Sequence, residues 1–395
     1  MRDSDGIVGL IAPVPAATFM GEYWQEKPLV VQRGRPEYFA NLISVEQVAA
    51  LLSSADLPSG AIDVANSDAP VDRGQYAPAG PVDVLKVQQL FSKGATIVLS
   101  EVQRWLPPLA QLCRGLEKEF SGPFQTNVYL TPPGGKGFRP HYDTHDVFVL
   151  QVAGAKEWTV CGNPVELPLP SQPFDHAAHL PGEVRVSCEL GAGDVLYIPR
   201  GFVHHARSLE QTSLHVTLGA LLPTWADLLG EMLSELALTE PAFRRALPPD
   251  FARPGFDLAA ARRVLAALLE QANDAALLGS IVERLAENFV VGRRPLAPGQ
   301  LEQLVNLPKL ALTSQAGPRP GLIYRLRANA DSMVVLCHGR EITFPPHAAE
   351  ALSFALHRSR YRVSEIPGLD DAGKLSLVRR LVEEGLVMCY MPASP

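Results

Sequence analysis

The sequence lacks several features that would place it in a specialised class of protein. Its 5 cysteines are scattered singly with no C-x-x-C pair, so neither a disulfide framework nor a thiolate zinc site is expected. No run of about 18 uncharged apolar residues occurs. The apolar stretch GIVGLIAPVPAA follows Asp3 and Asp5 rather than a basic region. We therefore expect neither export nor membrane insertion, and a reducing, cytoplasmic location.

Composition and charge further limit the kinds of protein to which this chain could belong. With 47% apolar and 19% charged residues the chain has ordinary globular composition. Its 395 residues are too many for one ordinary core and suit two or three domains. The formal net charge of −7 argues against direct nucleic-acid binding and suits a basic protein partner.

The sequence pattern changes twice along the chain. The first part mixes helices with short strands: ATFMGEYWQEKPLVV predicts a helix that ends before Pro28 and then a strand, and SVEQVAALLSS predicts a helix with a capping box formed by Ser44 and Gln47. From about residue 124 to 222 the chain consists of short β-rich runs separated by Gly, Pro and Asp. This pattern predicts an antiparallel barrel or jelly roll built from TNVYLT, DVFVLQV, EWTVC, EVRVSCEL, DVLYIP and SLHVTLGAL.

Helices return after Pro223. Leucines lie at helical spacing in TWADLLGEMLSEL, DLAAARRVLAALLEQAN and ALLGSIVERLAENFV. Beyond SQAGPRPG the tail offers strands at YRLRA, MVVLC and EITFP and helices at HAAEALSFALHRS and GKLSLVRRLVEEGLV. We expect a helical module followed by a small α+β unit of winged-helix type.

The chemistry is concentrated in PHYDTHDVFVLQVAGAKEWTV. If this stretch is a strand, His141 and Asp143 face the same side and can bind one cation. A third ligand is available from His204 or His205 in GAGDVLYIPRGFVHHARS. Two histidines and one carboxylate with open positions opposite are typical of non-haem Fe(II) sites. The triplet HYD alone also arises by chance in proteins that bind no metal, and the second motif is what favours a metal site.

These two motifs together resemble the Jumonji-type (JmjC) cupin oxygenases, in particular the ribosomal oxygenase branch. The similarity extends to YWQEKPLVV and KGATIVLSEVQRWLPPL before the barrel and to the segments after it. It implies an α+β protein with a double-stranded β-helix (cupin jelly roll) core. The implied domains are a catalytic domain with a helical lead-in at 1–222, a helical dimerisation module at 223–295 and a winged-helix-like domain at 296–395.

The resemblance also implies the ligands and the cosubstrate. The metal ligands would be His141, Asp143 and His204, with His205 as a neighbour. A histidine stands at the place of His145 in family members without binding the metal, so His145 is not expected to be a ligand. The family requires Fe(II), O₂ and 2-oxoglutarate, and the distal carboxylate of 2-oxoglutarate needs a fixed cation.

The G-x-K-x-W pattern of the family places Lys156 as that cation. From the residues alone, Lys156 in GAKEW could equally be a surface lysine in a turn. Asn127 and Tyr129, two apart in QTNVYLT, share one face of a strand and match family positions that bind the cosubstrate or metal-bound water. Without the resemblance, Tyr129 would be interpreted as core packing.

The function implied is hydroxylation of an Arg or His side chain of a protein, most simply a basic ribosomal protein, by a homodimer. One alternative is a related oxygenase that modifies a peptide or natural product, which shares the same motifs. The other is a non-catalytic cupin whose winged-helix-like tail binds nucleic acid. Against this last alternative stand the net charge and the lack of a basic stripe.

Overall fold

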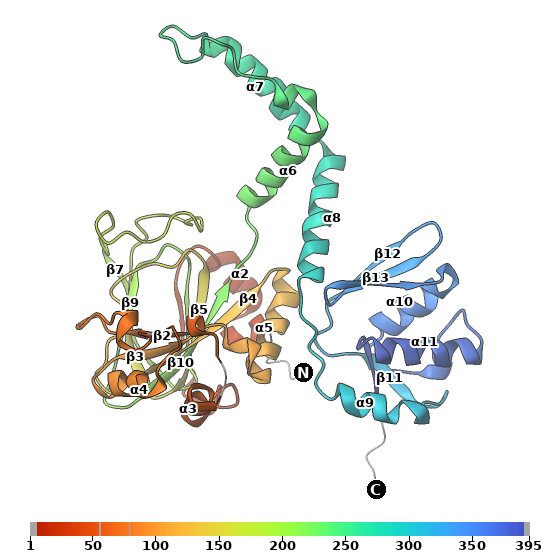
Figure 1. Cartoon of the computed structure of the whole chain (residues 1–395), viewed down its shortest axis with the longest axis horizontal. Helices are drawn as coiled ribbons and strands as arrows, with labels where there is room; N and C mark the ends of the chain where they lie inside the picture. The colour runs from red at the N-terminus through yellow and green to blue at the C-terminus, as the bar shows by residue number, and fades with distance from the viewer. Residues whose placement is uncertain (1–5, 55–56, 79, 391–395) are drawn as a thin grey trace. The chain divides into compact units, whose positions relative to one another are not determined.

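The computed structural model describes residues 6–54, 57–78 and 80–390 and divides into two compact units that meet in sequence at Leu222 and Pro223 (Figure 1). Each unit is described by itself. The first is called the barrel unit. In the second, α6 (Trp225–Thr239), α7 (Leu258–Ala272) and α8 (Ala275–Val291) are called the arm. None of the helices in the described residues is long and apolar enough to span a membrane.

The barrel unit is built from two antiparallel sheets, as the β-rich runs predict. The larger has the order β1-β8-β5-β10-β4-β3-β2 and the smaller the order β7-β6-β9. The last strand of the unit, β10, lies between β4 and β5 and pairs with β4 along its whole length. The strands are β1 (Leu29–Val31), β2 (Ile62–Ala65), β3 (Thr96–Leu99), β4 (Phe124–Thr131), β5 (Asp146–Ala153), β6 (Ala155–Cys161), β7 (Val184–Gly191), β8 (Val195–Ile198), β9 (His204–Ser208) and β10 (Ser213–Ala220).

Strand β5 shows how the two sheets face each other. Alternate side chains of a strand point to opposite faces. Phe148 and Leu150 pack into the core shared with the N-terminal helices, whereas Val147 and Val149 pack with Trp158 of the smaller sheet. Because both faces of β5 are covered, the strand is an almost continuous apolar run.

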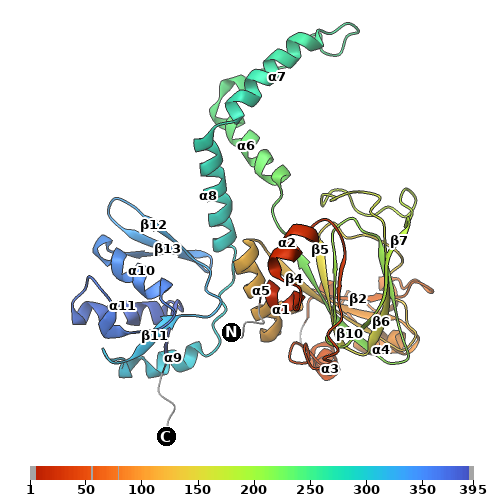
Figure 2. The same cartoon turned by 180° about the vertical axis from the view of Figure 1, so that it is seen from behind.

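The N-terminal helices supply the apolar partner of the larger sheet (Figure 2). Phe19 and Trp24 contact Phe148 and Tyr197, with the rings of Phe19 and Tyr197 5.0 Å apart. The helices of this part are α1 (Ile7–Ile11), α2 (Ala16–Glu22), α3 (Val45–Ser54), α4 (Val84–Ser92) and α5 (Pro107–Phe120), with 3-10 turns at Ser59–Ala61, Arg73–Gln75 and Val102–Arg104.

The capping box predicted for α3 is confirmed. The backbone N–H of Ser44 donates to Oε1 of Gln47 over 2.9 Å, and the backbone N–H of Gln47 donates to Oγ of Ser44 over 3.2 Å. The helix predicted before Pro28 ends at Glu22, and the strand after it is β1.

The arm consists of the three leucine-rich helices expected after Pro223 (Figures 1 and 2). Thr224 and Asp227 form a capping box at α6, and Asp257 and Asp274 cap α7 and α8 through their side chains. Arg284 of α8 pairs with Glu231 and Glu235 of α6. No residue of α7 is buried, and a 3-10 turn lies at Pro241–Arg244.

The remainder of the second unit is the expected α+β module. Its sheets have the orders β12-β13-β14 and β15-β11-β16, and α10 and α11 pack on a common apolar core. One expectation was wrong: GKLSLVRRLVEEGLV is not all helix, because Gly385 adopts φ 75° and the chain continues as β16. The elements are α9 (Gln300–Asn306), β11 (Gln315–Pro318), β12 (Arg325–Ala328), β13 (Met333–Cys337), β14 (Arg340–Phe344), α10 (Ala349–His357), β15 (Tyr361–Arg362), α11 (Asp371–Glu383) and β16 (Val387–Tyr390), with 3-10 turns at Leu307–Lys309, Pro346–Ala348 and Val363–Glu365.

Candidate active site

The structure brings His141, Asp143 and His204 together at one end of the barrel. One potential ligand atom from each lies within 4.8 Å of the others. Nε2 of His204 is 3.6 Å from one carboxylate oxygen of Asp143, and Nε2 of His141 is 4.0 Å from the other. The group thus presents two imidazoles and a carboxylate to one point, as a metal ion requires.

The local geometry differs from the expected strand. His141 and Asp143 precede β5, which begins only at Asp146, and His141 forms an isolated β-bridge with His204. The backbone N–H of His204 donates to the carbonyl of His141 over 2.8 Å, and the N–H of Gly201 donates to the carbonyl of Asp143 over 3.1 Å. Side-chain alternation along a strand is therefore the wrong reason for the pairing. Backbone hydrogen bonds from Gly201 and from His204, the first residue of β9, to the segment before β5 bring the residues together.

Both histidines are held in one tautomer. Nδ1 of His141 donates to the carbonyl oxygen of Arg139 over 2.8 Å, and Nδ1 of His204 donates to that of Phe202 over 3.0 Å. A carbonyl oxygen can only accept, so Nδ1 carries the proton and Nε2 keeps a free lone pair. This orientation by an outer hydrogen bond is typical of metal-binding histidines.

Gly201 allows the loop between β8 and β9 to pass close to the backbone of Val165. Its φ is 90°, and a Cβ at this position would lie 2.2 Å from the carbonyl oxygen of Val165. Any larger residue would therefore displace the turn that leads to His204.

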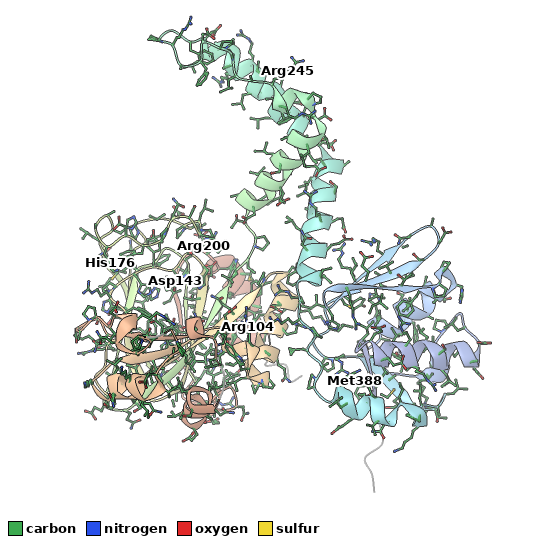
Figure 3. All side chains as sticks on the ribbon, in the orientation of Figure 1. Arg104, Asp143, His176, Arg200, Arg245 and Met388 are labelled. Atoms are coloured by element: carbon green, nitrogen blue, oxygen red, sulfur yellow. The ribbon has the colours of Figure 1, made fainter. Side chains whose placement is uncertain are left out.

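A buried ion pair joins the same two segments. Asp146, which is 1% exposed, accepts from the backbone N–H of Arg200 over 3.3 Å and lies 3.7 Å from its guanidinium. Tyr197 and Gln25 also donate to the Asp146 carboxylate. The Asp146 carboxylate thus connects the segment that contains Asp143 with the loop that contains Arg200. Figure 3 labels both of these residues.

The electrostatics favour ligands that are ready to bind a cation. Burial and, after it, the neighbouring His141 lower the pKa of His204 to about 4, against the opposing effect of Asp143. Burial alone would raise the pKa of Asp143, but His204, His141 and His145 outweigh it and hold that pKa below its usual value. At neutral pH the carboxylate is charged and the His204 imidazole is neutral, the forms in which they bind metals.

A cavity of about 60 Å³ lies beside these three residues, between the facing sheets. Lys156 of β6 projects into it and is 3% exposed, and burial lowers its pKa to about 7. Within the described part of the chain its ammonium has no anionic partner. The cavity is lined by Thr96, Tyr129, Gly137, Phe138, His141, Asp143, Val147, Val149, Lys156, Trp158, His204, His205, Ala206, His215 and Thr217.

Two further polar groups in this cavity also lack partners. Among the described residues, neither Nδ1 of His215 nor Nε1 of Trp158, both buried, has a hydrogen-bond partner. The His215 ring stacks on Tyr129 with centroids 4.6 Å apart and meets Trp158 edge-on at 5.6 Å. Burial, then Lys156, lowers the pKa of His215, and burial, then Asp143, raises that of Tyr129. Lys156, His215 and Trp158 thus form a polar cluster suited to an anion.

Asn127 is placed differently from Tyr129. Its Oδ1 accepts from the backbone N–H of Glu101 over 3.2 Å, and it is not among the residues that line the cavity. Thr217, its neighbour across the β4–β10 ladder, does line the cavity. A role for Asn127 toward the cosubstrate stays a prediction.

His215 and Phe138 were not singled out by sequence reasoning. A signal for His215 was present, since it is an imidazole in the middle of the apolar run SLHVTLGAL. Strand parity within β10 puts His215 and Thr217 on the same face. Phe138 follows a glycine-rich turn and carries no pattern that would distinguish it.

A wider groove of about 440 Å³ adjoins the cavity and shares Phe138, His205 and Ala206 with it. We call it the mouth groove. His205 lines both the groove and the cavity, and it is not part of the cluster formed by His141, Asp143 and His204. The other lining residues are Ser67, Asp68, Lys136, Arg139, Pro140, Glu157, Thr159 and Arg207.

Comparison with known proteins agrees with the resemblance. Residues 98–228 match the JmjC domain family. The chain is 36% identical over 250 residues to ribosomal oxygenase 1 of Gallus gallus, covering 61% of this chain and 41% of that protein. It is 28% identical over 436 residues to the bifunctional lysine-specific demethylase and histidyl-hydroxylase NO66 of Branchiostoma floridae, covering 98% and 67%. The chain therefore spans less than half the length of ribosomal oxygenase 1.

Solved structures give the same fold. The Escherichia coli protein ycfD matches with a TM-score of 0.58 at 22% identity, covering 95% of this chain and 98% of that one. A structure of the ribosomal oxygenase YcfD with cobalt and 2-oxoglutarate matches with a TM-score of 0.54 at 20% identity, covering 96% and 99%. The predicted JmjC cupin fold and the resemblance to ribosomal oxygenases are confirmed.

Proposed function

On the premise that residues 98–228 are a JmjC domain, we propose that this protein is an Fe(II)- and 2-oxoglutarate-dependent oxygenase that hydroxylates a side chain of another protein. The observation that carries the proposal is the cluster of His141, Asp143 and His204 beside a cavity that contains the buried Lys156. A site for a metal alone would have no use for a dehydrated ammonium nearby, whereas a metal plus a dicarboxylate would.

The donor set fits Fe(II). His141 and His204 offer Nε2 lone pairs fixed by their outer hydrogen bonds, and Asp143 offers the carboxylate. The cofactors together supply an oxidant that inserts one atom of O₂ into a C–H bond while 2-oxoglutarate is converted to succinate and CO₂. The YcfD structure is named as a complex with cobalt and 2-oxoglutarate, which supports a metal ion together with 2-oxoglutarate here.

The polar cluster fits the cosubstrate. Lys156 supplies the cation for a distal carboxylate, and Nδ1 of His215 or Nε1 of Trp158 supplies an N–H donor once an acceptor arrives. The carboxylate in turn keeps Lys156 protonated, because an adjacent anion raises the pKa that burial lowers. Tyr129 orients the His215 ring by stacking on it. We keep Asn127 as a further candidate cosubstrate residue.

The relatives support a protein substrate. Their names include ribosomal oxygenase and histidyl-hydroxylase, so we propose an Arg or His side chain of a ribosomal protein as the target. An oxygenase that modifies a peptide or natural product would share every residue of this site and remains the alternative. The direct test is to incubate the purified protein with Fe(II), 2-oxoglutarate and the host's ribosomal proteins.

The expected result is succinate together with a mass gain of one oxygen atom on one ribosomal peptide. The matched control is Asp143→Ala, which removes the carboxylate ligand and should give neither product. A protein that binds iron but consumes no 2-oxoglutarate with any ribosomal fraction would contradict the proposal.

We further propose that the protein is a cytoplasmic C2 homodimer that associates through its helical module at 223–295, followed by a winged-helix-like domain at 296–395. The support is the set of exposed apolar side chains on the arm, among them Trp225, Leu265 and Leu269, which are 77%, 55% and 55% exposed. Such surfaces on a soluble protein usually become buried on association.

A further inference from the structure

The mouth groove is the surface that a target side chain would cross to reach the metal-binding residues, and its charges restrict that side chain. Phe138, His205 and Ala206 belong both to the groove and to the cavity, so the two spaces are continuous. The groove is built from β6, β9 and the loops that follow β2 and β4.

Every carboxylate at this surface already has a cationic partner or belongs to the metal site. Glu157 of β6 stands opposite Arg207 of β9 in register, and their side chains pair at 2.5 Å. Asp68 pairs with Lys136 at 3.1 Å. In the cavity Asp143 is the sole carboxylate among the described lining residues. A substrate guanidinium that paired with Glu157 would displace Arg207 from its ion pair. The number of ion pairs would not increase, so binding would not become more favourable.

Arg139 makes the groove cationic. Its side chain is exposed, and within the described ranges it has no ion pair. Its backbone carbonyl accepts from His141, which fixes the residue close to the metal ligands. With Lys136, Arg139 and Arg207 against Asp68 and Glu157, the lining carries three positive and two negative charges.

Phe138 offers a flat apolar surface at the junction of groove and cavity. It is 41% exposed, and its ring lies 5.6 Å from the His141 ring and 6.3 Å from the Tyr129 ring. An aromatic face can also attract a guanidinium, but this attraction is smaller than the penalty for removing a fixed charge from water without a counter-ion. A planar ring that can be neutral gains the stacking without that penalty.

We propose that the mouth groove selects an uncharged planar side chain, an imidazole rather than a guanidinium, with Phe138 as the stacking surface and Arg139 as the group that repels fixed cations. This inference rests on the proposed function, and it decides between the two targets, Arg and His, left open above. It is a statement about specificity, so it can fail while the oxygenase activity stands.

The first experiment measures binding alone. Protein loaded with Mn(II) and 2-oxoglutarate is titrated by calorimetry with N-acetylhistidinamide and, separately, with N-acetylargininamide above pH 7. We expect the histidine probe to bind at least tenfold more tightly. In Arg139→Glu, which supplies an unpaired carboxylate, the preference should shrink or invert. Arg185→Glu, on β7 outside the groove, is the matched control and should keep it. Equal affinities in the wild type, or no measurable binding of either probe, would overturn the inference.

The second experiment locates the oxygen. In the ribosomal-protein incubation, fragmentation of the oxidised peptide should place the added oxygen on a histidine. Oxygen on an arginine would overturn the specificity inference while supporting the oxygenase activity. The absence of both oxygen gain and succinate would instead contradict the proposed function, so the two failures are distinguishable.

Discussion

The barrel unit and the arm depart from the usual distribution of side chains in opposite directions. In the barrel, groups that normally face water are buried: Lys156, His204 and His215 are 3%, 6% and 3% exposed. In the arm, groups that normally avoid water face it: no residue of α7 is buried, and Leu258 is 75% exposed. A fully buried lysine is uncommon, and so is a helix on which many apolar side chains are exposed together.

Each departure lowers the stability of the isolated chain and is relieved by a different kind of partner. A buried ammonium is stabilised by an anion, and exposed leucines are stabilised by another apolar surface. The comparison therefore predicts a small charged ligand for one unit and a protein surface for the other. The following changes test each half of it.

The largest effect is expected from the metal ligands. His204→Ala removes a neutral imidazole held toward Asp143 and should abolish 2-oxoglutarate turnover and iron binding. His205→Ala, next in sequence but facing the mouth groove, is the matched control and should keep most of both. Succinate formation and iron content measure the outcome. Loss of metal in His205→Ala with retention in His204→Ala would reverse the assignment.

The next effect concerns the buried cation. Loss of one member of a buried charge pair costs about 3 to 5 kcal/mol, which corresponds to a hundredfold or more in affinity. Lys156→Ala should therefore bind iron normally but raise the apparent Michaelis constant for 2-oxoglutarate by about that factor. Lys156→Arg should retain partial activity, because the guanidinium still brings a positive charge to the carboxylate. Full activity is not expected, because the guanidinium is bulkier than the ammonium. If the alanine variant's saturation curve overlays the wild type, the cosubstrate anchor lies elsewhere.

A substitution in the arm is expected to change the oligomeric state of the protein and not its catalytic activity. Leu265→Glu places a charge among exposed apolar side chains of α7 and should convert a dimer into a single chain of 42.8 kDa. Leu301→Glu, on α9 outside the arm and 79% exposed, is the control and should remain dimeric. Light scattering at micromolar concentration gives the masses. A wild type with the mass of one chain would refute the dimer.

The smallest effect is a pH dependence of stability. The pKa of Lys156 is about 7 in the folded chain against 10.5 for an unperturbed lysine. Between these values the unfolded chain holds a proton that the folded chain has released, so the free energy of unfolding rises with pH. Below pH 7 both states are charged, and the burial penalty is at its largest.

Lys156→Met removes this contribution while keeping the volume. From pH 7 to pH 9 the wild type, free of metal and 2-oxoglutarate, should gain about 2 kcal/mol relative to Lys156→Met. Denaturant titrations at several pH values measure the difference. Parallel pH profiles for the two proteins would mean that the folded-state ammonium is not dehydrated.

The sequence predicted the parts of this molecule that depend on local pattern. Ser44 and Gln47 are three apart and cap α3 as expected. The alternation and turn residues of 124–222 predicted the β-rich unit. The two histidine motifs predicted the cluster of His141, Asp143 and His204, whose metal binding and role in catalysis stay predictions.

What could not be predicted depends on contacts between distant segments. The pairing of His141 with His204 is a bridge between the segment before β5 and the first residue of β9, which no local period encodes. The short β9 was missed because the imidazoles and charges of its HHARS run hide the strand pattern. The environment of Lys156 depends on His215 of the distant strand β10 as well as on Trp158 of its own strand β6. GAKEW alone therefore could not distinguish the residue from a surface lysine.

The position of β10 has a consequence for biosynthesis. It is the last strand of the barrel unit to be translated, yet it separates β4 from β5. Until residues 213–220 leave the ribosome, β4 and β5 each present an unpaired edge, which favours aggregation and recruits chaperones. The segments that carry Asp143 and Arg200 flank β5 and β8, which form one sheet with β10. We therefore expect a nascent chain shorter than the barrel unit to lack the arrangement of His141, Asp143 and His204.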